Sequence, residues 1–275
     1  MLELFDTHSH YNDEQFDEDR EELLNKIYEE NVTKIIVVGY NIIGSKKAVE
    51  LAKKNNYIYS SVGIHPSDIE KTKEEIDKQI NKIEELAKIK KVVAIGEIGL
   101  DYHWEKEKKE LQKYAFIKQI QLAQKLKLPI IIHTRDAIAD TIEILKTVKI
   151  ENSGVLHCCT LNKELINTGL DAGLYTSFGG PITYKNTKNL ELIKEIPEDK
   201  ILIETDSPYL SPEPNRGKRN DSRNIKYIAA KIAEIKQTSI EEIAKTTYQN
   251  AQKLFKIYSA WGYNSQLWYL LYKNM

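Results

Sequence analysis

The stretch IIIHTRDAIADTIEILKTV, residues 130–148, contains the unit that decides the fold. It begins with three β-branched residues, Ile130 to Ile132, a short apolar run typical of a buried strand. His133 follows directly, and from Ala137 to Val148 apolar residues recur three and four positions apart, as on one face of a helix. An apolar strand followed by an amphipathic helix is the repeating unit of a parallel α/β sheet.

The same pattern recurs on both sides of this stretch. Eight apolar runs predict strands: Leu2 to Phe5, Lys34 to Val38, Ile58 to Ile64, Val92 to Ile95, Ile130 to Ile132, Gly154 to Leu156, Leu174 to Ser177 and Ile201 to Ile203. The stretches between them predict helices: Glu14 to Glu30, Ser45 to Lys54, Lys73 to Lys88, Glu107 to Lys127, Ala137 to Val148, Lys163 to Asp171 and Thr187 to Glu195. We therefore expect a single-domain (β/α)8 TIM barrel, with a doubly wound open sheet as the alternative.

Composition excludes several classes of protein. The chain has 275 residues, 41% of them apolar, and its 40 Lys+Arg nearly balance its 41 Asp+Glu. This balance argues against a nonspecific nucleic-acid clamp. The only two cysteines, Cys158 and Cys159, are adjacent, which excludes a disulfide scaffold. The apolar runs are too short to span a membrane and the start MLELFD does not resemble a signal peptide, so we expect a cytoplasmic protein without membrane contact.

The end of the chain departs from the pattern. We expect the barrel to occupy residues 1–258 and an aromatic C-terminal extension to occupy residues 259–275. The last eighteen residues, YSAWGYNSQLWYLLYKNM, carry six aromatic side chains. An additional helix packed on the barrel or a dimer contact is the favoured interpretation, and a membrane-surface or partner-binding tail is the alternative. We expect a monomer or a weak homo-oligomer.

Polar residues directly follow most of the predicted strands, where the active site of a TIM barrel lies. They are rich in metal ligands, and five of the six histidines are among them. The sets are Asp6 to His10, His65, Glu97, His133, His157 and Glu204 to Asp206.

Their spacing predicts a metal centre. His8 and His10 are two residues apart on one strand, so their rings project to the same side. Around one barrel mouth, these two histidines would join the other predicted ligands, Glu97, His133, His157 and Asp206. Four imidazoles and two carboxylates can hold two divalent ions and leave positions for water and substrate. We expect Glu97 to bridge the ions and Asp206 to orient and deprotonate the attacking water. The alternative for each carboxylate is a helix cap or an ion pair.

Other residues near these strands suggest the substrate. We expect His65 to donate to a substrate phosphate or to support a ligand. In the proline-rich segment after Asp206, the side chains of Arg216, Lys218 and Arg219 suit phosphate oxygens, although such a run is often only a solvated surface. The thiols of Cys158 and Cys159 are expected to act as small buried side chains and not as nucleophiles. His103 is expected at the surface.

The motifs, taken in order, resemble the TatD family of metal-dependent deoxyribonucleases in the amidohydrolase superfamily. They are FDTHSH (5–10), VGIHP (62–66), GEIGLDY (96–102), IIHTRDA (131–137), LHC (156–158), SFGG (177–180), ETDSPYL (204–210) and RGKRN (216–220). The resemblance implies a TIM-barrel hydrolase with the six metal ligands given above. It also implies phosphate contacts at four positions: His65, Arg216, Lys218 and Asn220. The sequence departs from the family where Cys158-Cys159-Thr160-Leu161 replaces the usual Cys-Phe-Thr-Gly.

These residues predict a hydrolase that uses two divalent metal ions on a phosphate ester, and the resemblance implies DNA phosphodiester bonds as the substrate. The resemblance implies a 3′-5′ exodeoxyribonuclease acting on single strands or 3′ ends. Mg, Mn and Zn all remain open as the ion, because histidine suits zinc and manganese, whereas magnesium prefers oxygen ligands. The alternatives are a metal-dependent hydrolase of another ester, of an amide or of a small phosphoester, such as an acyl-tRNA-type ester, and a barrel without catalysis that binds partners.

Overall fold

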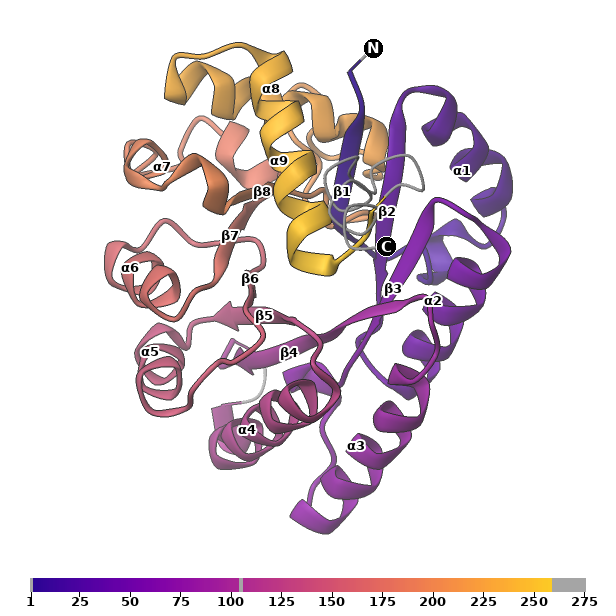
Figure 1. Ribbon diagram of the computed structural model, residues 1–275, viewed down its shortest axis with the longest axis vertical. Coiled ribbons are helices and arrows are strands. Elements are labelled where there is room, and N and C mark those ends of the chain that lie inside the picture. Colours follow the sequence, from indigo (N-terminus) through magenta and orange to yellow (C-terminus); the bar gives the residue numbers. More distant parts are fainter. Residues whose placement is uncertain (1, 104–105, 259–275) are drawn as a thin grey trace, which may run out of the picture.

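The computed structural model describes residues 2–103 and 106–258, and within them eight parallel strands form one sheet (Figure 1). The strands are β1 (Leu4–Ser9), β2 (Val32–Val38), β3 (Ile58–Val62), β4 (Val92–Asp101), β5 (Ile130–Arg135), β6 (Gly154–Leu156), β7 (Tyr175–Phe178) and β8 (Ile201–Ile203). The α-helices are α1 (Arg20–Glu29), α2 (Ile42–Lys54), α3 (Lys73–Ala87), α4 (Lys109–Leu126), α5 (Ile138–Thr147), α6 (Lys163–Asp171), α7 (Leu192–Glu195), α8 (Ile225–Lys236) and α9 (Ile240–Phe255). The predicted extension, residues 259–275, lies outside the described residues.

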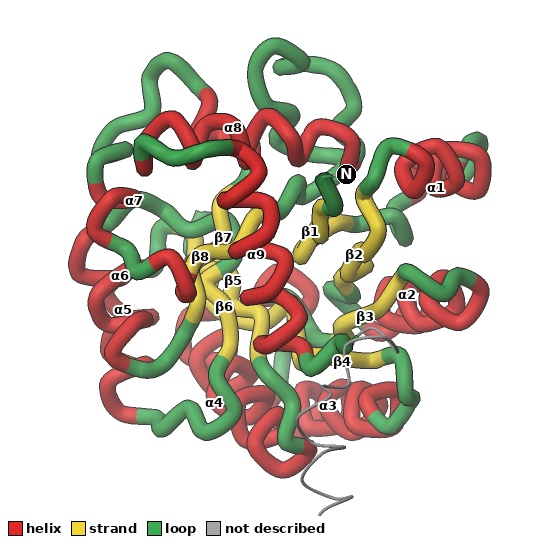
Figure 2. The backbone as a smooth tube through the Cα atoms, turned by 45° about the horizontal axis from the view of Figure 1, so that its top comes forward, coloured by secondary structure: helices red, strands yellow, loops and turns green. Residues whose placement is uncertain are grey.

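The strands pair in chain order and close into a barrel. Their order runs from β1 to β8 without the reversal that a doubly wound sheet requires. A parallel bridge joins Ser9 to Ser207, beside hydrogen bonds from Asp206 N to His8 O and from His10 N to Ser207 O, at 2.9 and 2.7 Å. The predicted TIM barrel is confirmed, and the alternative of an open sheet is wrong. Figure 2 shows the helices arranged around the strands.

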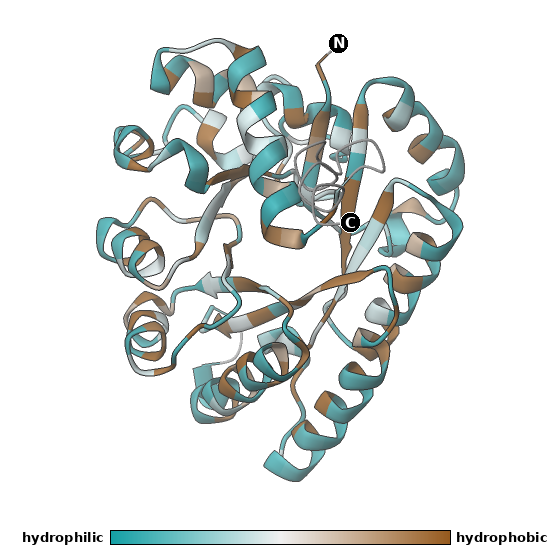
Figure 3. Cartoon of the chain, in the orientation of Figure 1, coloured by the Kyte–Doolittle hydropathy of each residue, from teal (hydrophilic) through white to brown (hydrophobic). Residues whose placement is uncertain are grey.

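Alternating side chains along each strand divide the core into two layers. Strand residues such as Phe5, Ile36, Ile131 and Leu202 belong to one cluster, which includes Phe255 of α9. Their neighbours in sequence belong to a larger cluster shared with the surrounding helices. Helix α9 lies in front of the strands in Figures 1 and 2 and packs against β1 and β8. Figure 3 shows the apolar residues on the strands and hydrophilic residues on the outer faces of the helices.

Three strands continue at least three residues beyond the ends that their apolar runs predict. The expected ends at Phe5, Ile95 and Ile132 fall inside β1, β4 and β5. His8 and Glu97, expected after strands, therefore lie within them, and both side chains are almost completely buried. The sequence pattern places the end of a strand at the first polar residue, because polar residues usually face water. His8 and Glu97 instead face the interior of the barrel, so the strands continue through them.

Candidate metal centre at the mouth of the barrel

The six predicted metal ligands converge at the carboxyl ends of the strands. His8 Nε2 lies 3.1 Å from His10 Nε2, so the two rings project to the same side as predicted. Asp206 Oδ1 lies 3.6 Å from His8 Nε2 and 3.3 Å from His10 Nε2. The ring of His157 stacks on that of His8 with 3.6 Å between centroids. Residues from the first and last strands thus meet at one point, although about two hundred positions separate them in the chain.

Glu97 lies at the centre of this cluster. Its Oε2 atom is 3.5 Å from His8 Nε2 and 3.7 Å from His10 Nε2. Its Oε1 atom is 2.9 Å from His133 Nδ1 and 3.5 Å from His157 Nε2. Each carboxylate oxygen therefore faces a different pair of histidines, which is the arrangement required of a ligand that bridges two ions.

The carboxylates of the centre are held ionised. Burial raises the pKa of Glu97, but nearby His157 and His8 outweigh it and the net pKa lies well below the ordinary value. Burial likewise raises the pKa of Asp206, and the hydrogen bond with His10 and the charge of His157 bring it below the ordinary value. Ionised carboxylates are the form that binds cations.

The carboxylates around His157 favour the charged form of its ring. Burial lowers its pKa, but Glu204 and Glu97 raise it to about 10. A buried cluster of carboxylates that needs a protonated imidazole at neutral pH is a cluster that a divalent cation would neutralise in its place.

Two carboxylates that the sequence analysis did not assign lie behind the histidines. Glu204 Oε1 is 2.7 Å from His157 Nδ1, and Asp101 Oδ2 is 3.2 Å from His133 Nε2. In each case the acid faces one ring nitrogen, and Glu97 faces the other. A carboxylate behind a histidine fixes its tautomer and makes it a better ligand. Glu204 and Asp101 stand in the quoted motifs ETDSPYL and GEIGLDY, but sequence position does not show which way a carboxylate points.

The residues fit divalent ions. Groups of three donors whose atoms lie within 4.8 Å of one another occur at His8, His10 and Glu97, and at His65, Glu97 and His133. Imidazole nitrogens with carboxylate oxygens form a donor set that suits zinc, manganese or iron. The two groups share Glu97, and both are set among supporting carboxylates.

His65 is oriented toward the cluster as a donor. It precedes the short turn η2 (Pro66–Asp68), and its Nδ1 atom accepts a hydrogen bond of 3.1 Å from Ser67 N. The ring proton is therefore at Nε2, which lies 3.9 Å from Glu97 Oε1. Burial and His133 lower the pKa of His65 to about 3, so the ring is neutral. A neutral ring with its N–H toward the centre suits the predicted contact with a phosphate oxygen.

The predicted phosphate residues of the basic loop after β8 differ from one another in their exposure and in their contacts. Arg216 is exposed and lies over the ring of Tyr184 at 4.3 Å, and Lys218 is exposed. Neither has an ion-pair partner among the described residues. Arg219 instead pairs with Asp19. Asn220 is buried.

The amide of Asn220 is already used within the protein. It donates to Thr205 O and Tyr209 O at 2.8 and 2.7 Å, and its oxygen accepts from Asn224 at 2.8 Å. Asn220 therefore fixes the loop after β8. A phosphate contact by this side chain stays a prediction, and it would require one of these bonds to break.

Cys159 is buried as the sequence analysis expects, whereas Cys158 is only partly buried, and His103 lies at the surface as expected. Burial raises the pKa of Cys158 well above its ordinary value and that of Cys159 to about 12, so both thiols stay protonated. Only the thiolate is a strong nucleophile. His103 is exposed, with its Nδ1 atom 3.1 Å from Asp136 Oδ2.

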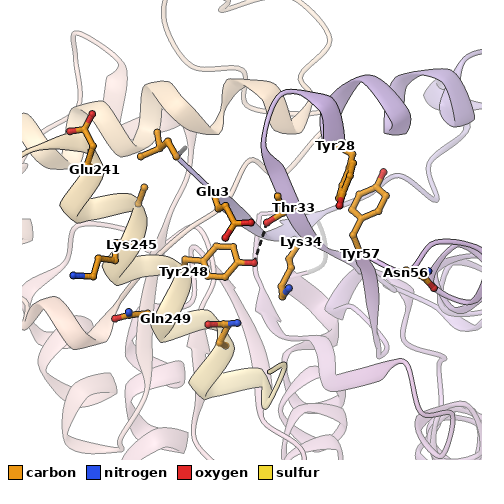
Figure 4. Close-up of a pocket in the computed structure, with 13 residues that line it drawn as sticks. Glu3, Tyr28, Thr33, Lys34, Asn56, Tyr57, Glu241, Lys245, Tyr248 and Gln249 are labelled. Carbon is orange, nitrogen blue, oxygen red and sulfur yellow. Dashed lines mark hydrogen bonds between the residues drawn. The ribbon is translucent and has the colours of Figure 1, made fainter. Parts of the chain in front are cut away.

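A large cavity lies at the other end of the barrel. It has a volume of about 1020 Å³ and is lined by the starts of β2 and β3 and by one face of α9 (Figure 4). Tyr28, Tyr57 and Tyr248 contribute aromatic rings, and Thr33 Oγ1 lies 3.1 Å from the hydroxyl of Tyr248. None of the predicted site residues lines this cavity.

Comparison with known proteins identifies the family. Residues 5–256 match the family model described as TatD related DNase. The chain belongs to this family. It is similar to the uncharacterized metal-dependent hydrolase YabD of Bacillus subtilis, with 47% identity over 257 residues, 92% of this chain and 99% of YabD. It is also similar to the uncharacterized metal-dependent hydrolase YcfH of Escherichia coli, with 36% identity over 259 residues, 92% of this chain and 96% of YcfH.

The solved structures agree with this assignment to the TatD family. The crystal structure of YJJV, a TatD homologue from Escherichia coli K12, superposes with a TM-score of 0.87 at 27% identity, covering 94% of this chain and 99% of that one. The predicted class of enzyme, a metal-dependent hydrolase, is thereby confirmed. Among residues 2–103 and 106–258, no helix has the length and apolar character needed to cross a bilayer.

Proposed function

We propose that this TatD family hydrolase cleaves DNA phosphodiester bonds and removes nucleotides from single strands or 3′ ends in the 3′-5′ direction. The observation that carries the proposal is Glu97, whose two oxygens face two separate histidine pairs across the barrel mouth. Two cations that share a bridging carboxylate clamp the attacking and leaving oxygens of a phosphoryl group. The family description, TatD related DNase, supports DNA as the substrate.

The chain's own side chains would then act on the phosphate and on water. Divalent ions held by these ligands would polarise phosphate oxygens and lower the pKa of water. Asp206, ionised and only 14% exposed, would take the proton of the attacking water. His65 would donate from Nε2 to a phosphate oxygen, and the unpaired charge of Arg216 would balance the charge that develops there.

The depth of the site favours a strand end. The side chains of Glu97 and Asp206 are only 5% and 14% exposed, so the centre is largely buried. A stiff duplex cannot bring one of its internal phosphates to a buried centre, whereas a flexible single-stranded 3′ end can reach it.

The test is release of mononucleotides from a single-stranded oligonucleotide labelled at its 3′ end. It is run in EDTA and then with Mg²⁺, Mn²⁺ or Zn²⁺. We expect cleavage only with metal, and a loss of about 100-fold or more in kcat for Asp206→Asn, as for removal of a general base. Glu97→Gln should abolish cleavage as well.

The control variant and the competing substrates are assayed with the same metal ion. Glu213→Gln, a carboxylate of the same loop that is not among the site residues, should keep full activity. An acyl ester and a nitrophenyl phosphate are assayed in parallel. Turnover of either one with an intact oligonucleotide would contradict the assignment to DNA and leave a hydrolase of another ester.

A further inference from the structure

Two tyrosine rings flank the metal centre at His10. Tyr40 follows β2, and its ring centroid lies 5.7 Å from that of His10. Tyr209 belongs to the loop after β8, and its ring centroid lies 6.2 Å from that of His10. Both side chains are in part open to solvent, and Tyr209 is 46% exposed. The two rings therefore lie beside the predicted metal ligands on the side of His10.

Both rings are held in place before any ligand arrives. The hydroxyl of Tyr209 donates to Asp13 Oδ2 at 2.7 Å. The ring of Tyr40 lies on the first turn of α2 at Gly44, where a Cβ atom would come within 3.1 Å of the ring. Glycine at this position allows the close contact. Rings that are already fixed lose little conformational freedom when a planar ligand stacks on them.

The tyrosines stand among exposed apolar side chains. On the same two segments, Ile43 is 70% exposed and Leu210 is 39% exposed. Among the described residues, six large hydrophobic side chains are exposed, and three of these, Ile43, Tyr209 and Leu210, lie on the segments that flank His10. An apolar rim around a polar, buried centre indicates a ligand with a flat apolar part joined to a charged part.

We propose that Tyr40 and Tyr209 form a stacking subsite for an unpaired nucleobase of the nucleotide whose phosphate lies at the metal centre. The proposal rests on the proposed function. Aromatic side chains bind any base because every base has a flat π face. A base within a duplex has both faces covered by its neighbours, so this subsite accepts a base only from a single strand or a frayed 3′ end.

The first test compares two single-stranded oligonucleotides of equal length, one intact and one with an abasic site at its 3′-terminal nucleotide. For Tyr40→Leu and Tyr209→Leu, which keep apolar bulk without a ring, we expect KM for the intact strand to rise about 5- to 150-fold, the equivalent of about 1–3 kcal/mol per stacked base. KM for the abasic strand should change less than twofold. Equal changes with both strands, or no change with either, would overturn the proposal.

Conservative and distant variants separate stacking from structural effects. Tyr40→Phe and Tyr209→Phe keep the ring and should retain the wild-type preference for the intact strand. Tyr28→Leu removes a tyrosine of similar exposure, 51%, from the cavity at the opposite end of the barrel, and should leave both KM values unchanged (Figure 4). Loss of the preference in the Phe variants, or in Tyr28→Leu, would contradict a stacking role.

A binding experiment decides the proposal without catalysis. Calorimetry measures the affinity of the metal-loaded protein for dAMP and for deoxyribose 5-phosphate, which lacks the base. We expect dAMP to bind more tightly, and the leucine variants to lose this difference while binding the sugar phosphate as the wild type does. If the wild type cleaves neither strand, the proposed function fails, and this measurement still supports or overturns the subsite.

Discussion

Glu97 is the residue at which the two halves of the centre meet. One of its oxygens faces His8 and His10, and the other faces His133 and His157. Each of the latter two has a second acid behind it. The centre is therefore two layers deep, and the outer layer sets the orientation of the inner one.

Replacing Glu204 by glutamine should weaken metal binding. Its carboxylate lies 2.7 Å from His157 Nδ1, and the substitution removes both the negative charge and the partner that orients the ring. We expect affinity for Zn²⁺, measured by competition with a chelator, to fall about 10- to 100-fold. Glu213→Gln serves as the control, and unchanged affinity in Glu204→Gln would remove Glu204 from the centre.

The backbone at Asp206 gives a second prediction. This residue has a φ of 56°, in the left-handed region that Asp and Asn tolerate better than other residues with a side chain. Asp206→Ala should have about 1 kcal/mol less unfolding free energy in urea than Asp206→Asn, because alanine tolerates this conformation less well. Both variants lack the carboxylate, so equal unfolding midpoints would show that the backbone conformation carries no penalty.

The inner ligands could be predicted from the sequence because histidines and carboxylates directly follow apolar runs, and parallel strands bring their carboxyl ends together. The outer acids could not, because Glu204 and Asp101 lie far along the chain from their partner histidines, His157 and His133. Tyr40 and Tyr209 were missed for the same reason. Nothing in their local sequence relates them to His10.

Two helices are shorter in the structure than the sequence pattern predicts. The segment predicted as one helix from Glu14 to Glu30 is a short turn, η1 (Glu14–Phe16), followed by α1, because Phe16 turns inward onto Tyr11. The predicted helix from Thr187 to Glu195 is reduced to α7. Asn189 has a φ of 60°, which interrupts right-handed helix.

Helix α9 contributes Phe255 to the cluster of strand side chains that includes Phe5, and this contact can be tested. Phe255 is 3% exposed and packs 6.5 Å from Phe5, ring centre to ring centre. Phe255→Ala should lower the unfolding free energy in urea by about 3–5 kcal/mol, as for other buried aromatic residues. Activity per folded molecule should be unchanged, because the site lies at the other end of the strands. A change in KM would show that α9 influences the site.

The barrel as a whole is closed at its mouth by the same segments that carry the ligands. β1 and the segment after β8 are joined at Ser9 and Ser207, next to His8, His10 and Asp206. Ions held by these residues would tie the first strand to the last. Metal binding is thus expected to stabilise the entire barrel and not only a loop.

Removal of metal should lower the melting temperature. A ligand at 100 times its dissociation constant adds about 2.7 kcal/mol to the folded state. For a chain of this size that corresponds to about 5–11 °C. Calorimetry in EDTA and in Zn²⁺ measures the shift. Glu97→Gln should abolish most of it, and a full shift in that variant would place the stabilising ions elsewhere.

β1 and the segment after β8, which meet at Ser9 and Ser207, are also far apart in the order of synthesis. His8 and His10 leave the ribosome first, and Asp206 follows only after nearly two hundred further residues. A nascent chain that has not yet reached Asp206 holds His8 and His10 without this ligand, so the complete donor set of the centre forms only after β8 has been synthesised.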